Sequence, residues 1–181
     1  MKVSFTGAQS TGKTTLLQAV KSNEDFRFKY EFIDEITRRM QKKGLKINEA
    51  GGNTTQLLIM NEHIKNLLYE NAIMDRCAID GVVYTHWLYK QNKVEKWVWE
   101  YSVNVFNHYV NRYDIIFYLK PEFDIVDDGV RSVDISFRDE IVELFDRYIK
   151  YVRRVRTPVI TLSGTVEERL NKFYSTIKKY E

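Results

Sequence analysis

The residues best suited to chemistry lie near the start of the chain, in the segment Gly-Ala-Gln-Ser-Thr-Gly-Lys-Thr at positions 7–14. This segment matches the phosphate-binding pattern G-x-x-x-x-G-K-[ST] at every fixed position. Gly7 and Gly12 permit backbone angles that a Cβ would hinder, so successive N–H groups can turn toward one ligand. Lys13 would reach the β- and γ-phosphates of a nucleoside triphosphate, and the Thr14 hydroxyl would bind Mg²⁺.

The flanks of this loop fit the same interpretation. A β-prone run at residues 2–6 precedes it, and residues 13–21 are predicted to form a helix whose N-terminus adds further N–H groups. The pattern therefore indicates nucleoside triphosphate binding and does not say what is done with the nucleotide. The residues that we expect to bind ATP here are Gly7, Gln9, Ser10, Thr11, Gly12, Lys13, Thr14 and Thr15.

Asp75 and Arg76 follow a short apolar run that is predicted to be a strand at 72–75. Asp75 is placed to hold Mg²⁺ with Thr14, directly or through water. An alternative is that Asp75 only caps the helix that follows. Arg76 would reach a phosphate or a ring substituent of an acceptor.

Two adjacent acidic residues lie at the end of the predicted strand 31–34, with Asp34 as its last residue and Glu35 opening the next helix. A carboxylate there can accept the proton of an attacking hydroxyl group or orient it. We favour Glu35 as the base, because Asp34 would be the last residue of the strand. The alternative is that both only stabilise the dipole of the next helix.

Residues 122–138 are polar and are predicted to form a lid. Arg131 and Arg138 would close on the phosphoryl group in transit and stabilise its charge. The alternative is a surface loop whose charges pair with one another.

The elements that must position these residues alternate along the chain. Strands are predicted at 2–6, 31–34, 72–75, 114–119 and 158–162, with helices between them and residues 22–30 as a connection. This order predicts an α/β fold of the P-loop NTPase type, a single domain over 1–181 with a five-stranded parallel sheet, helices on both faces and a lid segment. Ligands in such sheets bind at the carboxyl ends of the strands.

Several helices have predicted limits or faces that can be checked. Asn53 or Thr54 would cap one helix, and Thr165 would cap the last through a capping box with Glu168. Residues 80–112 are predicted to form two helices that meet near 91–92, and residues 138–155 to form another. The expected buried positions are Leu57, Met60, Ile64, Leu67 and Leu68 in the first helix, and Val94, Trp97, Tyr101, Val105 and Tyr109 around the second of the pair.

Composition narrows the class of protein. The chain has 181 residues, of which 44% are hydrophobic and 29% charged, and no apolar run approaches the length of a membrane span. Cys77 is its single cysteine and is expected to be a packing residue, which fits a cytoplasmic location without a secretory signal. The net charge of +3 is weak for a nucleic-acid-binding protein. Local basic clusters at 38–43 and 150–156 nevertheless leave nucleic acid as an alternative partner.

The motifs together resemble the ribosylnicotinamide kinase (NadR-like) family of P-loop kinases, which is close to nucleoside and nucleotide kinases. The first block, at 7–14, is highly specific, and the others are weak alone but follow in the family's order. They are Asp-Glu-Ile-Thr-Arg at 34–38, Gln56, Met-Asp-Arg-Cys-Ala-Ile-Asp at 74–80, Asp-Gly-Val-Arg-Ser at 128–132 with Arg138, and Leu-Ser-Gly-Thr-Val-Glu-Glu-Arg at 162–169.

The resemblance implies ATP as the donor and a nucleoside-like acceptor. It puts Glu35, Arg38 and Asp128 near the acceptor, and it puts Ser163 and Gly164 against the adenine. The leading hypothesis is therefore an ATP- and Mg²⁺-dependent kinase that acts on a hydroxyl of a nucleoside- or nucleotide-like acceptor. The alternatives are a polynucleotide or modified-base DNA kinase, and a P-loop ATPase or GTPase switch. No guanine-reading Asn-Lys-x-Asp motif is present, since residues 111–114 read Asn-Arg-Tyr-Asp. Neither the acceptor nor the oligomeric state follows from the sequence.

Overall fold

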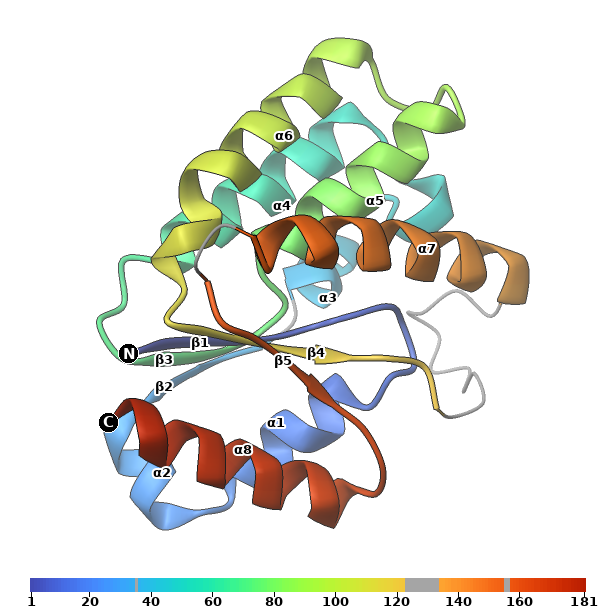
Figure 1. Ribbon diagram of the computed structural model, residues 1–181. Coiled ribbons are helices and arrows are strands. Elements are labelled where there is room, and N and C mark those ends of the chain that lie inside the picture. Colours follow the sequence, from blue (N-terminus) through green and yellow to red (C-terminus); the bar gives the residue numbers. More distant parts are fainter. Residues whose placement is uncertain (35, 123–133, 155–156) are drawn as a thin grey trace.

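The computed structural model describes residues 1–34, 36–122, 134–154 and 157–181, and its centre is a parallel sheet between two layers of helices (Figure 1). The five strands lie in the order β2-β3-β1-β4-β5. Their bounds are Lys2–Thr6 for β1, Glu31–Ile33 for β2, Ala72–Asp75 for β3, Ile115–Leu119 for β4 and Val159–Leu162 for β5. All neighbouring pairs are parallel, so the predicted fold class is confirmed.

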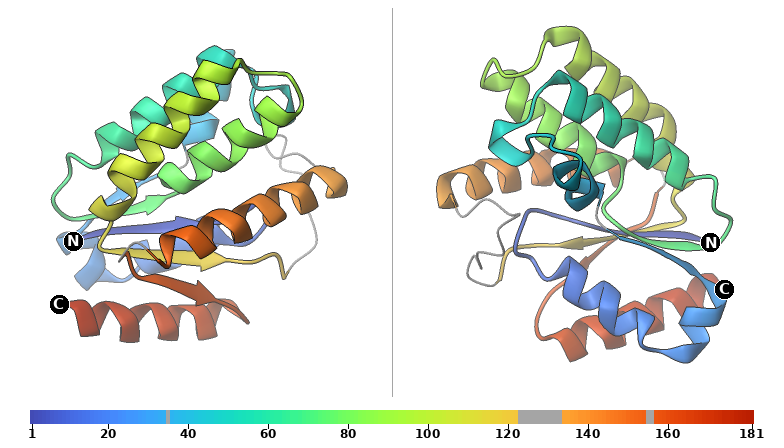
Figure 2. Two further views of the ribbon diagram at one scale, coloured as in Figure 1. Left: turned by 45° about the horizontal axis from the view of Figure 1, so that its top comes forward. Right: turned by 180° about the vertical axis from the view of Figure 1, so that it is seen from behind.

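The helices form one layer on each face of the sheet (Figures 1 and 2). The layer below the sheet in Figure 1 contains α1 (Lys13–Lys21), α2 (Glu24–Lys29) and α8 (Val166–Tyr180). The layer above contains α3 (Ile36–Lys42), α4 (Asn53–Asn66), α5 (Ala78–Lys90), α6 (Lys96–Tyr109) and α7 (Ile135–Val152). Short 3₁₀ turns cover Asn48–Ala50 and Val110–Arg112. None of the helices within the described ranges is both long and apolar enough to cross a membrane.

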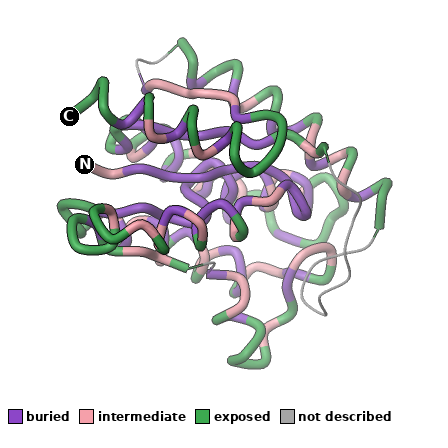
Figure 3. Tube along the Cα trace, turned by 90° about the horizontal axis from the view of Figure 1, so that it is seen from below, coloured by how far each residue is buried: buried purple, intermediate pink, exposed green. Residues whose placement is uncertain are grey.

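The central strands are buried on both faces, as Figure 3 shows by the purple run through the middle of the trace. Every residue of β4 is buried, which is why this strand reads as a continuous apolar run. Below the sheet, Phe173 of α8 packs against Phe5 and Phe117, with ring centroids 5.5 and 5.0 Å away. These contacts hold α8 under the strands that end at the phosphate loop.

Some predicted limits are wrong. Residues 22–30 contain the helix α2, whose N-cap Asn23 accepts from the N–H groups of Asp25 and Phe26. The N-cap of α4 is Gly52, and Asn53 instead bonds Glu95 at the start of α6. The lower helix α8 does begin with the predicted capping box of Thr165 and Glu168.

The buried faces of α4 and α6 also differ from prediction. In α6 the buried residues are Val98, Ser102, Val105 and Phe106, whereas Trp97 is 52% exposed. In α4 they are Thr55, Gln56, Met60, His63 and Asn66, whereas Leu68, beyond the helix end, is 81% exposed. The face of α4 is polar in part because it lines a pocket.

Candidate active site

The phosphate loop connects β1 to α1 and is shaped by two glycines. Gly7 has φ 143°, and a Cβ built on it would lie 2.3 Å from the carbonyl oxygen of Leu119, the last residue of β4. Gly12 has φ 85° at the entry to α1. Only glycine therefore fits at position 7, where β4 passes against the loop.

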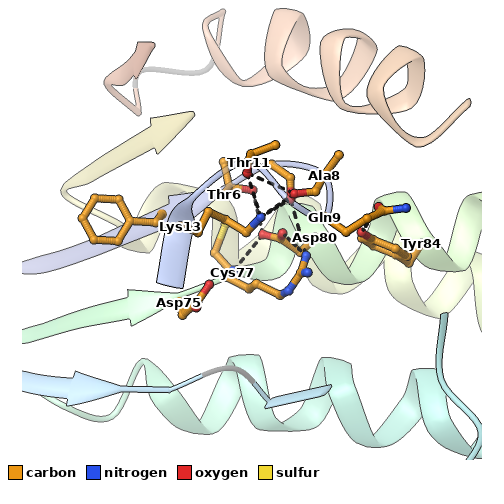
Figure 4. Close-up of polar contacts among 12 residues, drawn as sticks. Thr6, Ala8, Gln9, Thr11, Lys13, Asp75, Cys77, Asp80 and Tyr84 are labelled. Carbon is orange, nitrogen blue, oxygen red and sulfur yellow. Dashed lines mark hydrogen bonds and ion pairs between the residues drawn. The ribbon is translucent and has the colours of Figure 1, made fainter. Parts of the chain in front are cut away.

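The ammonium group of Lys13 lies against its own loop (Figure 4). It donates to Gly7 O at 2.9 Å, Ala8 O at 2.5 Å and the Thr11 hydroxyl at 3.0 Å. The side chain is 5% exposed. These bonds hold a positive charge over the loop, where phosphate oxygens are expected.

Thr14 and Asp75 meet as the sequence predicted. The Thr14 hydroxyl donates to Asp75 Oδ2 at 2.7 Å, and Asp75, at the end of β3, is 2% exposed. The N-cap of α5 is Cys77, so Asp75 does not have the capping role that was its alternative. A hydroxyl and a carboxylate suit Mg²⁺, which keeps few protein ligands and takes the rest from phosphates and water. Among the described residues no cluster of three or more acidic, His or Cys side chains offers a fuller metal site.

Arg76 joins the loop to the elements above the sheet. Its Nη1 donates to Asp80 Oδ1 at 2.9 Å and to Gly7 O at 3.4 Å, and its guanidinium carbon lies 5.4 Å from the centre of the Tyr84 ring. Its φ of 82° is left-handed, which is costly for a residue other than glycine. From this backbone the side chain of Arg76 reaches the phosphate loop and α5.

Asp80, to which the sequence analysis gave no role, anchors this arrangement. The carboxylate is 2% exposed and accepts from the Thr6 hydroxyl at 2.6 Å and from Cys77 N at 3.0 Å. Together with the ion pair to Arg76, these contacts connect β1, the turn after β3 and α5 (Figure 4). Asp80 therefore positions Arg76 without needing exposure to a ligand.

A pocket lies beside the loop and above the sheet. Arg76 and residues of α3, α4 and α5 line it, and the latter include Ile36, Gln56, His63, Gly81 and Tyr84. The Tyr84 hydroxyl donates to Gln9 Oε1 in the phosphate loop at 3.1 Å. Arg76 and Tyr84 therefore line the pocket and also contact the phosphate loop.

The α4 side of the pocket carries two buried polar groups. Gln56 is 2% exposed, and its Oε1 accepts from the Thr85 hydroxyl at 3.0 Å. His63 is 1% exposed, and its Nε2 has no hydrogen-bond partner within the described part of the chain. Burial lowers the pKa of His63 to about 4, so the ring is neutral at physiological pH. The sequence analysis gave His63 no role, although its spacing from Gln56 and Met60 on one helix face was a usable signal.

The other predicted site residues are not all in this pocket. Asp34 is exposed and lines a separate depression with Arg39, Glu62 and Lys65. Arg38, on α3, is half-buried and is not among the residues that line the pocket, and Thr15 is exposed on α1. Glu35, Asp128 and Arg131 lie outside the described residues, so their predicted roles stay predictions.

Two predicted features lie on described residues near the end of the chain. Arg138 is in the first turn of α7, which starts at Ile135 behind the N-cap Asp134 and not at Arg138 as predicted. Ser163 and Gly164 follow β5, and Gly164 N donates to Glu122 Oε2 at 2.7 Å. The same oxygen accepts from Arg169, whose other nitrogen donates to Thr11 O in the phosphate loop. Arg169 was part of the resemblance, but no role was derived for it.

Comparisons with known proteins agree with this fold. The sequence matches the model of a family described as AAA domain over residues 2–169. Two solved structures of deoxyadenosine kinase from M. mycoides superpose on the chain. The structure with dCMP and dCDP has a TM-score of 0.72, 16% identity and 100% coverage of both chains. The structure with dCTP has a TM-score of 0.70, 15% identity, and coverage of 99% of this chain and 100% of the other.

A further similar structure is the NadR protein in complex with NR, with a TM-score of 0.73 and 20% identity, covering 98% of this chain and 50% of NadR. The predicted resemblance to NadR-like P-loop kinases is thereby confirmed at the level of the fold. A search of the curated proteins finds no match.

Proposed function

The chain belongs to the AAA domain family, and from this membership and its site we propose an ATP-dependent kinase that phosphorylates a hydroxyl of a nucleoside- or nucleotide-like acceptor. The observation that carries the proposal is that Arg76 and Tyr84 line the pocket and also contact the phosphate loop. Arg76 Nη1 lies 3.4 Å from Gly7 O, and the Tyr84 hydroxyl lies 3.1 Å from Gln9 Oε1. An acceptor in the pocket would therefore present its hydroxyl group next to a triphosphate in the loop, as in-line transfer requires.

The chemistry of the pocket supports an acceptor with a polar ring. Ile36 and the Tyr84 ring offer apolar and aromatic surface, while Gln56 and His63 offer hydrogen-bonding groups in a buried wall. A heterocycle with hydrogen-bonding groups on its edge would give His63 Nε2 a partner, whereas an aliphatic acceptor would leave that nitrogen without one. The similar structures agree with this, since deoxynucleotides and NR are ligands of those proteins.

The residues of the chain have distinct proposed roles in transfer. The N–H groups of the loop and Lys13 would hold the phosphates and stabilise the charge that develops on the group in transit. Thr14 and Asp75 would hold Mg²⁺, which when bound neutralises charge on the β- and γ-phosphate oxygens. Arg76 would orient the acceptor beside the loop. Glu35 as base, Arg131 and Arg138 as lid residues, and Ser163 with Gly164 at the adenine remain part of the proposal.

The position of the basic clusters favours a small acceptor over a polynucleotide. Arg38, Arg39 and Lys42 lie on α3, which follows the carboxyl end of β2. Arg153 and Arg154 precede β5 and therefore lie toward the opposite edge of the parallel sheet. Arg39 is also paired with Glu62 at 3.1 Å. A phosphate backbone would need a continuous basic track, which these two clusters do not form.

A GTPase switch is disfavoured by the location of residues 111–114. They precede β4, at the amino ends of the strands, whereas the phosphate loop lies at the carboxyl ends. Asp114 there accepts from the backbone N–H of Lys2 at 2.6 Å, and Tyr113 is 2% exposed. This segment is therefore part of the sheet packing, far from any base bound near the loop.

The experiment is a screen with γ-labelled ATP and Mg²⁺ against nucleosides, nicotinamide riboside, nucleoside monophosphates and short oligonucleotides. We expect label to move to one of the small acceptors. ATP hydrolysis at a rate that no acceptor changes, with no labelled product, would contradict the kinase proposal.

A cytoplasmic location completes the proposal, because the single cysteine and the use of ATP both fit it.

A further inference from the structure

Arg169 is a buried cation that the proposed reaction does not yet use. It lies in the first turn of α8 and is 1% exposed. Burying a guanidinium is costly unless its N–H groups are bonded. Nη1 donates to Thr11 O at 2.7 Å, and Nη2 donates to Glu122 Oε2 at 2.8 Å. One partner is thus the backbone of the phosphate loop, 158 residues away in the sequence.

The second partner leads to the loop after β5. Glu122 Oε2 also accepts from Gly164 N at 2.7 Å. Gly164 has φ 87°, a left-handed backbone conformation that favours glycine. Burial acts to raise the pKa of Glu122, but the hydrogen bonds from Arg169 and Gly164 N outweigh it and lower that pKa. Glu122 is therefore ionised and pairs with Arg169 at neutral pH.

The bond to Thr11 O has a consequence for the next residue. A trans peptide is planar, so the C=O of Thr11 and the N–H of Gly12 point in opposite directions. With Thr11 O directed at Arg169, Gly12 N–H is directed away from α8. Gly12 lies where the loop enters α1, with φ 85°, a region in which a glycine peptide can rotate easily. A bond from Arg169 removes that freedom.

We propose that Arg169 is a positioning residue that fixes the phosphate loop and the 163–165 loop relative to each other, so that the triphosphate and the base of one ATP molecule are received together. The proposal rests on the proposed function, because it assumes that ATP binds these two loops. Pre-orienting both loops lowers the cost of ordering them on binding. A lysine at position 169 has a point charge and cannot make the two-armed contact.

The test compares ATP with inorganic tripolyphosphate, both with Mg²⁺, by calorimetry on the full chain. Tripolyphosphate reports the phosphate loop alone, and ATP reports both loops. We expect Arg169→Lys to weaken both ligands by about 10-fold, the loss of one charged hydrogen bond. Glu122→Ala frees the 163–165 loop but leaves the Arg169 bond to Thr11 O, so it should weaken ATP about 10-fold and tripolyphosphate less than about twofold. Lys172→Met, which removes an exposed cation from the same helix, is the matched control and should change neither.

Melting temperatures measured in parallel separate positioning from folding. If Arg169→Lys and Glu122→Ala lower only the melting temperature and bind both ligands as the natural chain does, the inference is wrong. If Arg169→Lys does not fold, the test rests on Glu122→Ala. Equal affinity for ATP in that variant and in the natural chain would then also overturn the inference. A natural chain that binds neither ligand would instead overturn the proposed function, and the inference with it.

Discussion

At the scale of single residues, Lys13 shows how the loop prepares a charge for its ligand. Three hydrogen bonds of its ammonium group go to oxygens of residues 7–11. A bound triphosphate offers stronger, charged acceptors in the same place, so the ammonium can exchange weak partners for strong ones without moving far. The same charge then opposes the negative charge that develops during transfer.

Replacing Lys13 by alanine should therefore lower kcat by roughly 100-fold or more. Lys21→Ala, at the other end of α1, is the control and should leave kcat within about twofold, because only charge near the phosphates contributes. The assay is steady-state transfer to the acceptor found in the screen, with circular dichroism to confirm folding. Near-normal transfer by the Lys13→Ala variant would remove the basis of the proposed function.

His63 makes a prediction about pH. Its pKa is lowered to about 4 in the folded chain, first by burial and further by Arg76 and Arg39, against an opposite effect of Asp80. The unfolded chain, with a pKa near 6.5, binds a proton that the folded chain excludes. The contribution of His63 to stability is therefore intact above pH 6.5 and falls between about pH 6.5 and 4.

The expected loss over that range is at most about 3 kcal/mol. Urea unfolding of the natural chain and of His63→Gln at several pH values isolates it, because all other titrating groups are shared. The difference between the two free energies of unfolding should change with pH below about 6.5 and be flat above it. A difference that is constant from pH 7 to 4 would mean that His63 is not buried as the structure has it.

At the scale of elements, the contact between α4 and α5 sets the shape of the pocket. A Cβ on Gly81 would lie 2.1 Å from Met60 Sδ and 3.3 Å from His63 Cδ2, and Met60 is fully buried. The absence of a side chain at Gly81 thus lets α4 approach α5 and brings His63 to the pocket. Any larger residue must displace one of these two side chains.

Gly81→Ala should destabilise the chain by about 1–3 kcal/mol, the usual cost of overpacking. Met60→Ala alone should also destabilise it, by leaving a cavity. In the double variant the new methyl group has room. The sum of the stability losses of the two single variants should therefore exceed the loss measured for the double variant. Additive losses in urea unfolding would show that Gly81 and Met60 do not compete for the same space.

The elements also show what the sequence predicts and what it does not. The strands were placed to within about a residue, because each is a short apolar run between polar residues. The stripe of α4 was misassigned in part, although Met60 is buried as predicted, because the prediction equates the buried face with the apolar one. In α6 the buried Val98 and Ser102 each follow a predicted position by one residue, and Val105 is buried as predicted. In α4 the residues Gln56, His63 and Asn66 are buried instead, which only a neighbouring pocket or helix explains.

The candidate site divides in the same way. The loop and its Thr14–Asp75 contact were predicted, the first from a contiguous motif and the second from the rule that parallel strands end at one edge. Asp80 and Arg169 were missed because their partners are distant in sequence, Thr6 for the first and Thr11 for the second. Such contacts leave no local pattern, and only a three-dimensional arrangement reveals them.

At the scale of the whole molecule, the distribution of charge separates the two classes of acceptor. A polynucleotide acceptor would release counterions, giving a log–log slope of about −0.7 per phosphate contact for a single strand. A small nucleoside has no such charge. Because the basic clusters lie toward opposite ends of the strands, we expect binding to a short single-stranded oligonucleotide to be weak at 150 mM salt, ~10⁻⁴ M or weaker.

Fluorescence anisotropy with a labelled oligonucleotide between about 50 and 200 mM salt measures this slope directly. The informative variant is Arg153→Ala with Arg154→Ala, compared with Arg39→Ala in the other cluster. Submicromolar binding at 150 mM salt that is lost in the double variant would favour the nucleic-acid kinase that the sequence left open.

The reactivity of the Cys77 thiol can report how often the interior of this fold opens. It is the chain's single thiol, fully buried between Asp75 and Asp80 in the sequence, and burial, with the Asp80 charge, raises its pKa to about 12. Only a thiolate in contact with solvent reacts, so a disulfide reagent can label the folded chain only while the turn between β3 and α5 is open.

The labelling rate of the natural chain thus reports opening motions of the turn next to the phosphate loop, with no engineered probe. ATP with Mg²⁺ at saturating concentration should slow it, because the ligand stabilises the closed form. The same labelling assay can be applied to cell lysates, since ligands that slow the labelling of Cys77 are candidates for the acceptor. Immediate labelling in native buffer would show that this turn is not closed in solution.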